Sequence, residues 1–425
     1  MIIYYILIWS LPYMRHPIWN ATLGSGGLTV TKLIGAVSLL YSIVYLARRH
    51  GVPRYFATPQ SKWMMLLVAL AFYSFLTNER AEISLLNPIA TYSSALLLFF
   101  VTLNVIDSER RLYWSMMVAI GGVAFASLYL VSEWRRGLAV YGGGFRPGWV
   151  LGDSNYFTIA ALAVLPIAFE LSMTARRRWE KLYCIGCILL IFFTITIGAS
   201  RGGFLGIAVI MIYLAVRSGI TRKRLIRTMV VAIPFLVLAP NSPLHRFFAP
   251  APGDVQSVDK HLLGWMAGLN MVKEHPFFGV GLGNYKAVVV NYDTTGLVAA
   301  DPHIAHNAYL EIGAEMGIPA LIVYLFFLGT TFLSLETTRK RALAANSRSL
   351  ANLALGMQAS VLGASVAIFF VSGQYTRVFW FVLIMSMCIP ALVPKRSAAK
   401  KRPPPQEQPI EDPGMQVGPA LIEMP

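Results

Sequence analysis

Long, nearly uncharged apolar segments follow one another along most of the chain. Of its 425 residues, 56% are hydrophobic and only 13% are charged, and the mean hydropathy is +0.59. A soluble domain usually carries about 25% charged residues. A water-soluble enzyme of this length needs far more polar surface than this sequence provides, so the composition excludes that class. We therefore expect an integral membrane protein.

The lengths of the apolar segments predict helices. A helix that crosses a bilayer needs roughly 20 apolar residues, and shorter segments are tolerated when flanking side chains reach the interface. The segments are too long and continuous for the strands of a barrel. The predicted fold is an all-α polytopic membrane protein. Its twelve predicted spans lie near residues 2–14, 27–47, 62–77, 85–106, 112–132, 153–173, 182–198, 202–216, 228–240, 306–335, 350–371 and 377–393.

The distribution of basic residues supports this topology independently. The chain has 36 lysines and arginines against 20 aspartates and glutamates, a formal net charge of +16. If the N-terminus is cytoplasmic and the spans alternate, most basic residues fall in cytoplasmic segments, as membrane proteins require. Both termini are then cytoplasmic. The surplus of positive charge is explained by topology, so we infer no nucleic-acid partner.

The predicted topology divides the chain into four regions. Residues 1–240 hold the first nine spans, 241–305 form a long periplasmic loop, and 306–393 hold the last three spans. Residues 394–425 form a cytoplasmic tail rich in Lys, Pro and Gln, which cannot bury a core and is expected to be disordered. Long ordered loops are usually functional, so the loop and its borders are where we expect a site.

Arg201 is the first candidate functional residue. It lies in Gly198-Ala-Ser-Arg-Gly-Gly203, between strongly basic segments at 174–181 and 217–227. Both basic segments belong in the cytoplasm, so the chain crosses twice between them and Arg201 stands at a tight outer hairpin. A guanidinium there is costly unless it is paired or hydrated, and it matches phosphate oxygens bidentately. We expect it to bind an anionic ligand; an arginine that reaches lipid phosphates is the alternative.

His306 is the second candidate, at the border between the loop and the tenth span. A neutral imidazole has an ordinary pKa of about 6.5 and can accept a proton from a hydroxyl group. Either Glu311 or Glu315 could orient the ring, and the spacing does not decide between them. A capping or loop role is the alternative interpretation.

Three further motifs have simpler interpretations. His303 and His306 could bind a metal together with Asp301, but a zinc site needs three protein ligands in suitable geometry, so we expect no metal. The Gly-x-Gly-x-Gly sequence at 279–283 follows no clear strand and lacks the rest of a nucleotide fingerprint, so a tight turn packed on aromatic residues is expected. Asp153 is expected to cap the helix that it begins.

Together these features resemble the O-antigen ligase and O-antigen polymerase superfamily of bacterial envelope proteins. The resemblance covers most of the chain: the number of spans, the late external loop, and Ser200-Arg201-Gly202 at a hairpin. It also includes a segment with Trp265 that leads into His275-Pro-Phe-Phe-Gly-Val-Gly-Leu-Gly-Asn284. Asp153 and Asn155 look like the Asp-Pro-Asn segment of the family.

The most specific match is His306-Asn307, followed by nine residues and Gly317. The family pattern is His, then Asn, Ser or Gln, nine residues, and Gly-x-x-[Gly, Thr or Tyr]; Ala320 departs from its last position. Many members also have an arginine about four residues before the tryptophan. His261 stands there in this chain, so Lys260, His261 or Arg246 would have to supply that cation.

The resemblance implies an enzyme with a GT-C-like fold in the bacterial inner membrane. It would carry out inverting, metal-independent and cofactor-free glycosyl transfer at the periplasmic face. The donor would be a glycan on undecaprenyl pyrophosphate, held among membrane lipids, and the acceptor hydroxyl would belong to lipid A-core, another glycan or a protein. O-antigen or exopolysaccharide polymerases and protein O-oligosaccharyltransferases of the superfamily are alternatives. A transporter or flippase of lipid-linked sugars is the rival from another class.

The resemblance also implies roles for the candidate residues. His306 would act as the catalytic base, and Arg201 would stabilise the pyrophosphate leaving group. Further cations for the pyrophosphate would come from Arg146, Arg246, Lys260, His261 and Arg377. Supporting roles would fall to Asn307, His303, Glu311, Glu315 and Asp153.

Overall fold

The structure is a computed structural model of the whole chain. It describes residues 1–13, 29–49, 55–78, 88–141, 145, 147–148, 154–217, 252–298 and 301–394; at 141 and 252–260 only the backbone is described. The described residues are helical and contain no β-strand. The all-α prediction is therefore confirmed over this part of the chain.

The helices of the N-terminal half match the predicted apolar segments. They are α1 (Ile2–Ser10), η1 (Leu11–Tyr13), α3 (Val30–Arg48), α4 (Pro59–Thr77), α5 (Pro88–Val105), α6 (Glu109–Tyr141), α7 (Ser154–Thr174), α8 (Arg178–Gly198) and α9 (Arg201–Arg217). The remaining helices belong to the C-terminal half of the chain. It contains α12 (Pro252–Glu274), α13 (Tyr285–Val288), η3 (Val289–Tyr292), α14 (Ala308–Ala344), α15 (Arg348–Ala367), η4 (Ile368–Phe370), η5 (Gly373–Tyr375) and α16 (Arg377–Leu392).

Seven of the described helices are long and apolar enough to cross a membrane. They are α3, α5, α6, α7, α8, α14 and α15 with its continuation into η4. The segment Ile2–Tyr13 and helix α16 are shorter and also apolar. Eleven of the twelve predicted spans coincide with described helices, whereas the predicted span 228–240 lies outside the described residues. The chain is thus a multi-pass membrane protein by the composition of its helices.

Close packing around α15 holds the bundle together. Helix α15 contacts α7, α9, α14 and α16. A Cβ atom added at Gly206 of α9 would lie 2.7 Å from the backbone oxygen of Gly363 on α15. One added at Gly356 would lie 3.0 Å from the Cα atom of Ile167 on α7. Small residues of this kind let membrane helices approach closely, which fixes α7, α9 and α15 relative to one another.

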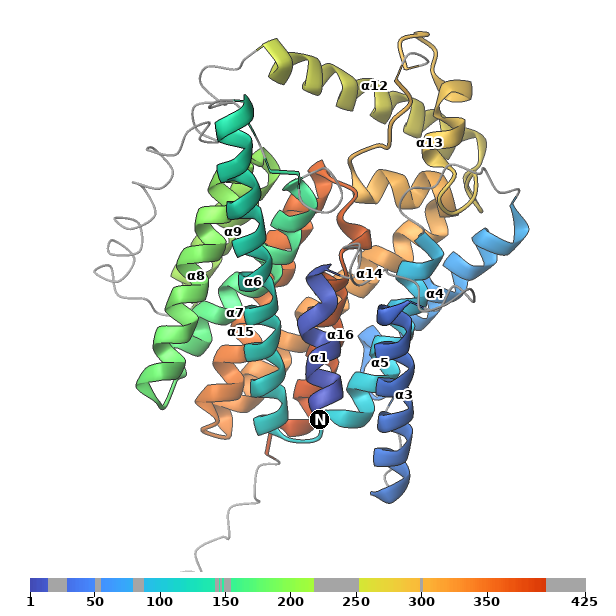
Figure 1. Cartoon of the computed structure of the whole chain (residues 1–425). Coiled ribbons are helices and arrows are strands. Elements are labelled where there is room, and N and C mark those ends of the chain that lie inside the picture. Colours follow the sequence, from blue (N-terminus) through green and yellow to red (C-terminus); the bar gives the residue numbers. More distant parts are fainter. Residues whose placement is uncertain are drawn as a thin grey trace, which may run out of the picture.

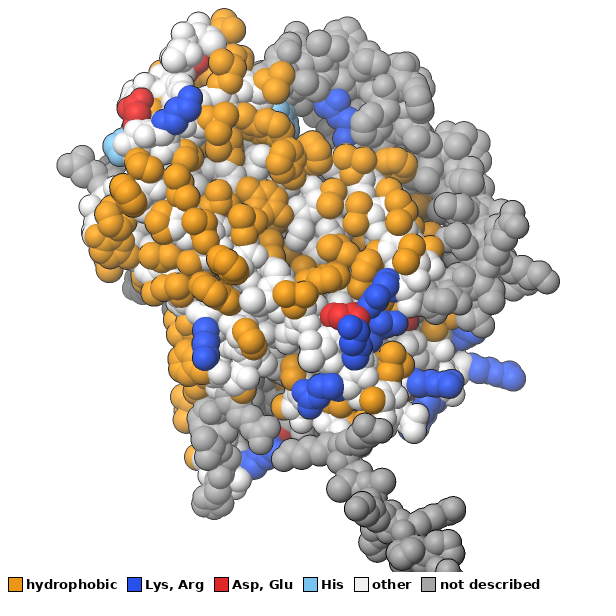
Figure 2. Space-filling model, turned by 180° about the vertical axis from the view of Figure 1, so that it is seen from behind, with side chains coloured by type: hydrophobic (Ala, Val, Ile, Leu, Met, Phe, Trp, Pro, Cys, Tyr) orange, Lys and Arg blue, Asp and Glu red, His pale blue; other side chains and the backbone are white. Residues whose placement is uncertain are grey.

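The two ends of the bundle differ in what they carry. The N-terminus and the turn between α7 and α8 lie at the lower end in Figure 1, and α12 and α13 lie across the upper end. Figure 2 shows a broad belt of hydrophobic side chains with Lys and Arg side chains gathered below it. At that end Glu336 pairs with three cations, Arg217, Arg339 and Lys340.

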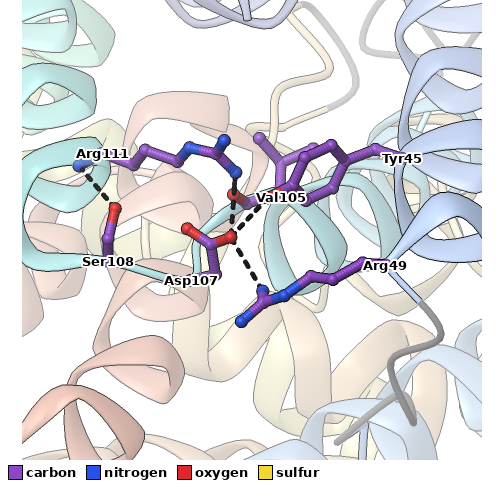
Figure 3. A network of polar contacts seen from close by, with 6 residues as sticks. All are labelled: Tyr45, Arg49, Val105, Asp107, Ser108 and Arg111. Carbon is purple, nitrogen blue, oxygen red and sulfur yellow. Dashed lines mark hydrogen bonds and ion pairs between the residues drawn. The ribbon is translucent and has the colours of Figure 1, made fainter.

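A second polar network at the lower end joins α3 to the turn between α5 and α6 (Figure 3). Asp107 accepts hydrogen bonds from Arg49 at 2.8 Å, from Arg111 at 3.1 Å and from the Tyr45 hydroxyl. The Arg111 guanidinium also lies 4.6 Å from the centre of the Tyr45 ring. These contacts anchor the C-terminal end of α3 at the basic end of the molecule.

Candidate active site

The structure places His306 just before Asn307, the N-cap of α14, in a backbone conformation that few residues adopt. Its φ angle is +48°, in the left-handed region, which costs an L-residue about 1–2 kcal/mol. Asn307 caps the helix, because its side-chain oxygen accepts hydrogen bonds from the N–H groups of Tyr309 and Leu310, both at 3.1 Å. Such conformations persist only where the surrounding structure imposes them, and they cluster at functional sites.

Helix α12 lies against this segment and stacks a second histidine on His306. The rings of His261 and His306 are 4.9 Å apart at an interplanar angle of 23°, and both side chains are partly exposed. One turn further along α12, the Trp265 indole N–H donates to the Ala305 carbonyl oxygen at 2.8 Å. His261, which occupies the position where the family pattern has arginine, thus contacts His306, the predicted base, directly.

His303 lies close to the same helix. Its Nδ1 atom is 2.7 Å from the Asp301 carbonyl oxygen, and a Cβ atom added at Gly264 would lie 3.2 Å from its Nε2 atom. Among the described residues, no group of three or more His, Cys, Asp and Glu side chains is placed to hold a metal ion. His303 thus lies against Gly264 of α12, near the His306 segment.

The hairpin that carries Arg201 has the predicted form. Helix α8 ends at Gly198, Ala199 takes a left-handed conformation with φ +48°, and α9 begins at Arg201. The Ser200 hydroxyl accepts a hydrogen bond from the Gly203 N–H at 3.2 Å. A Cβ atom at Gly203 would lie 2.2 Å from the Thr158 side chain, so this position has room for glycine only. Arg201 is partly exposed at the start of α9.

Two phenylalanines of η4 connect the Arg201 hairpin to the His306 segment. Phe370 lies against Gly202: a Cβ atom added to Gly202 would lie 2.9 Å from the Cβ atom of Phe370. Phe369 contacts Trp265 at a ring-centre distance of 5.4 Å and Tyr309 at 6.4 Å. The two predicted functional segments, 105 positions apart in sequence, therefore pack on neighbouring residues of one short helix.

The glycine-rich segment forms the predicted tight turn, and it packs on a break in α14. Gly279, Gly281 and Gly283 all have positive φ angles. Inside α14, Gly317 has φ 85° and ψ 169°, which interrupts the helix. The turn supplies the missing backbone partners. The N–H groups of Val280 and Gly281 donate to the backbone carbonyl oxygens of Ala314 at 2.8 Å and Glu315 at 3.0 Å. The carbonyl oxygen of Pro276 accepts from the Ile318 N–H at 2.7 Å. The glycine-rich turn and the break at Gly317 thus form one structural unit.

The carboxylates of Glu311 and Glu315 are buried on the first segment of α14. Glu311 accepts hydrogen bonds from the Ser372 hydroxyl and from the Gln374 amide, the latter at 3.0 Å. Glu315 accepts from the Tyr375 hydroxyl at 3.0 Å and from the Tyr285 N–H at 3.2 Å. Their partners belong to the α15–α16 connection and to α13. Sequence reasoning missed these four partners, which no motif or periodicity connects to the carboxylates.

Arg377 begins α16, directly after that connection. Its Nε atom donates to the Ser94 hydroxyl of α5 at 3.1 Å, and the side chain is partly exposed. Four other predicted residues cannot be placed in the same way. Arg146, Arg246 and Asp153 lie outside the described residues, and only the backbone of Lys260 is described, within α12.

A comparison with known families finds a match over part of the chain. Residues 185–325 match the family model of the O-antigen ligase. This segment is similar to the O-antigen ligase family. The resemblance expected from the sequence is thereby confirmed over this segment, which begins within α8 and ends within α14. The matched segment contains Arg201, Trp265, His306 and Gly317, and no curated protein matches the chain.

Proposed function

We propose that the protein transfers a glycan from undecaprenyl pyrophosphate to an acceptor hydroxyl group, with inversion and without a metal ion. The match to the O-antigen ligase family supports membrane glycosyl transfer of the ligase or polymerase type. The observation that carries the finer proposal is the strained His306, stacked on His261 at the start of α14. Within this class we propose the ligase reaction, with lipid A-core as the acceptor.

His306 is the proposed catalytic base. It removes the proton of the acceptor hydroxyl as that oxygen attacks the anomeric carbon from the face opposite the pyrophosphate. General-base assistance of this kind contributes about 10²–10⁴-fold to a rate. The cap at Asn307 and the Trp265 contact to Ala305 fix the backbone on both sides of the imidazole.

Arg201 is the proposed group that stabilises the leaving pyrophosphate. Negative charge grows on the pyrophosphate as the glycosidic bond breaks, and fixed cations in a low-dielectric site stabilise it. The hairpin geometry supports this role, because the Ser200–Gly203 contact and the tight packing of Gly203 hold Arg201 at a fixed helix start. His261 and Arg377 are proposed as further groups toward the phosphates, together with Arg146, Arg246 and Lys260.

The proposal includes a topology. Twelve spans with cytoplasmic termini, arranged as in GT-C enzymes, would place the α12–α13 end at the periplasmic face of the inner membrane. The gathering of Lys and Arg at the opposite end supports this orientation, since basic residues favour the cytoplasmic side.

The test is glycan transfer in proteoliposomes. Undecaprenyl-pyrophosphate glycan and candidate acceptors are supplied with a chelator and without nucleotide. The variants His306→Ala and Arg201→Ala are compared with His275→Ala, whose imidazole contacts Tyr292, and with Arg341→Ala at the opposite end of α14. We expect transfer by the wild type and both controls, and its loss in the two site variants.

The outcomes separate the competing functions. Transfer to lipid A-core supports a ligase, whereas transfer to a second glycan or to a protein hydroxyl replaces that proposal with a polymerase or a protein O-oligosaccharyltransferase. Movement of lipid-linked sugar between leaflets without transfer would contradict the proposal in favour of a transporter. Retained transfer in His306→Ala would contradict the role of the imidazole.

A further inference from the structure

A cluster of charged side chains joins α9 to α14 at the end of the bundle opposite α12 and α13. The Arg217 Nη2 atom lies 2.5 Å from Oε1 of Glu336, and the Lys340 Nζ atom lies 3.5 Å from the same oxygen. Arg339 reaches both helices, because its Nη1 atom is 3.8 Å from Oε2 of Glu336 and its Nη2 atom donates to the Arg217 carbonyl oxygen at 3.0 Å. Three cations thus share the carboxylate of Glu336.

The cations of this cluster outnumber the carboxylates beside them. Glu170 of α7 lies within electrostatic reach of Arg339, but none of the described ion pairs joins the two, and Glu170 is only 3% exposed. Even with Glu170 counted, three cations face two carboxylates. Because like charges at such short range repel one another, the cluster favours a further anion.

The sequence near the cluster adds positive charge and no negative charge. Positions 181–253 and 337–406 contain no Asp or Glu, whereas residues 222–227 add three arginines and a lysine shortly after α9. The competing anions within the chain are the four acidic residues of the C-terminal tail, Glu407, Glu411, Asp412 and Glu423.

The surroundings of the cluster indicate which kind of anion fits. Figure 2 shows Lys and Arg side chains gathered at the lower border of the hydrophobic belt. On α9, Ile212 and Val216 are 65% and 75% exposed, and Leu333, seven residues before Lys340 on α14, is 63% exposed. Guanidinium and ammonium groups bind phosphate oxygens strongly, and basic sites between membrane helices bind anionic head groups. Apolar side chains next to cations therefore fit a phospholipid better than a soluble anion.

We propose that the phosphate of an anionic phospholipid binds Arg217, Arg339 and Lys340, and that it holds α9 and α14 together. These are the two helices whose opposite ends carry Arg201 and follow His306. The lipid therefore fixes the spacing of the two candidate residues from the far end of the bundle. Only this effect on transfer rests on the proposed function; the binding of the lipid does not.

Lipid binding is measured on the purified full-length protein by native mass spectrometry, with phosphatidylglycerol and phosphatidylcholine of the same acyl chains. Arg217→Gln/Lys340→Gln is compared with Arg178→Gln/Lys181→Gln, which removes one arginine and one lysine from the exposed first turn of α8 at the same end. Each basic residue near an anionic surface contributes roughly fivefold in affinity, so the first double variant should bind phosphatidylglycerol about twentyfold more weakly. The control should bind it as the wild type does, and equal losses in both would overturn the proposal.

The variant Glu336→Gln is expected to act in the opposite direction. It keeps all three cations and removes the carboxylate that competes with the lipid for them. It should bind phosphatidylglycerol several-fold more tightly than the wild type, and this lipid should raise its melting temperature in detergent more than that of the wild type. A lowered melting temperature that phosphatidylglycerol does not restore would show a closed intramolecular cluster and contradict the proposal.

Two further measurements identify the occupant. Inorganic phosphate at the same concentration should not displace phosphatidylglycerol, because it has no acyl chains; displacement would assign the cluster to a soluble anion instead. Replacement of the four acidic tail residues by their amides in the full-length chain should leave the affinity for phosphatidylglycerol unchanged. Tighter binding in that variant would assign the cluster to the tail and sink the lipid proposal.

Transfer in proteoliposomes tests the coupling to the candidate site. The wild type and Arg178→Gln/Lys181→Gln should transfer several-fold faster when phosphatidylglycerol replaces part of the phosphatidylcholine, whereas Arg217→Gln/Lys340→Gln should not respond. An equal response of the two double variants would refute the coupling. If the wild type transfers no glycan at all, the proposed function fails, and the binding and melting measurements still decide whether the lipid site exists.

Discussion

The break in α14 predicts an unusually large effect of a single methyl group. Gly317 has φ 85° and ψ 169°, a region that only glycine occupies readily. An added Cβ atom would lie 2.2 Å from the carbonyl oxygen and 2.4 Å from the carbonyl carbon of Phe277, and 2.8 Å from the Phe278 nitrogen. These are backbone atoms, so no side-chain rotation relieves the overlap. In Gly317→Ala the 276–281 turn must therefore move away from α14.

The cost can be worked out from the contacts that this movement breaks. The backbone conformation alone costs an alanine about 1–3 kcal/mol. Three backbone hydrogen bonds join the turn to α14, and each contributes about 1 kcal/mol. We therefore expect Gly317→Ala to lower the free energy of unfolding by about 5 kcal/mol, a size that single substitutions reach only through a specific mechanism.

Two other glycines separate the components of this cost. Gly296 has φ 71° and no atom within 4 Å of an added Cβ atom, so Gly296→Ala introduces backbone strain without overlap and should cost about 1–2 kcal/mol. Gly329, inside α14, also has free space and an ordinary φ angle. Gly329→Ala should stabilise the helix by about 0.5–1 kcal/mol.

Thermal unfolding of the purified variants in detergent, together with transfer rates in liposomes, measures these effects. The melting temperatures should rank Gly329→Ala above wild type, then Gly296→Ala, and Gly317→Ala far below. Transfer should fall only in Gly317→Ala, because only this variant moves the segment that carries His306. If Gly317→Ala and Gly296→Ala had the same melting temperature, the claim that the turn and the break form one unit would be refuted.

Three further effects follow from single contacts. Asn307→Ala removes the cap of α14 and should lower stability by about 1 kcal/mol in thermal unfolding, while a Ser at this position should restore most of it. Trp265→Phe keeps the ring contact but loses the hydrogen bond to Ala305, so KM for the donor should rise with little change in melting temperature; a fall in melting temperature alone would count against a positioning role. The pKa of Asp293 lies below its usual range because the Thr295 hydroxyl and nearby backbone N–H groups donate to the carboxylate. The stability that this turn gains is present at neutral pH and lost as pH falls through that lowered pKa, so hydrogen exchange at 295–298 should increase there in the wild type and stay constant in Asp293→Asn.

The sequence predicts the helices well and their ends less well. Apolar runs identify every described span, because burial in lipid requires long uncharged helices. Helix α6 extends to Tyr141, well beyond the predicted end at 132, since Glu133, Arg135 and Arg136 interrupt the apolar run and hydropathy alone stops there. The predicted loop contains the 23-residue helix α12, which hydropathy alone does not detect because charged residues interrupt its apolar positions.

The site was predicted in its parts but not in its connections. The His306-Asn307 pattern and the Arg201 hairpin could be located because their residue types suggest chemistry at defined positions. The stacking of His261 on His306 and the partners of Glu311 could not, because segments far apart in sequence meet only through the fold. The predicted orientation of His306 by Glu311 or Glu315 stays a prediction, and both carboxylates have partners of their own in the α15–α16 connection and α13.

The glycine turn also imposes an order on the maturation of the protein. Its residues leave the ribosome before α14 does, yet they supply the backbone partners of the break at Gly317. In the proposed topology, the segment from α12 to the turn is translocated and folds back at the far end before the first part of α14 can settle. We therefore expect insertion of this helix to be the second of two steps, with the preceding loop acting as an intramolecular template.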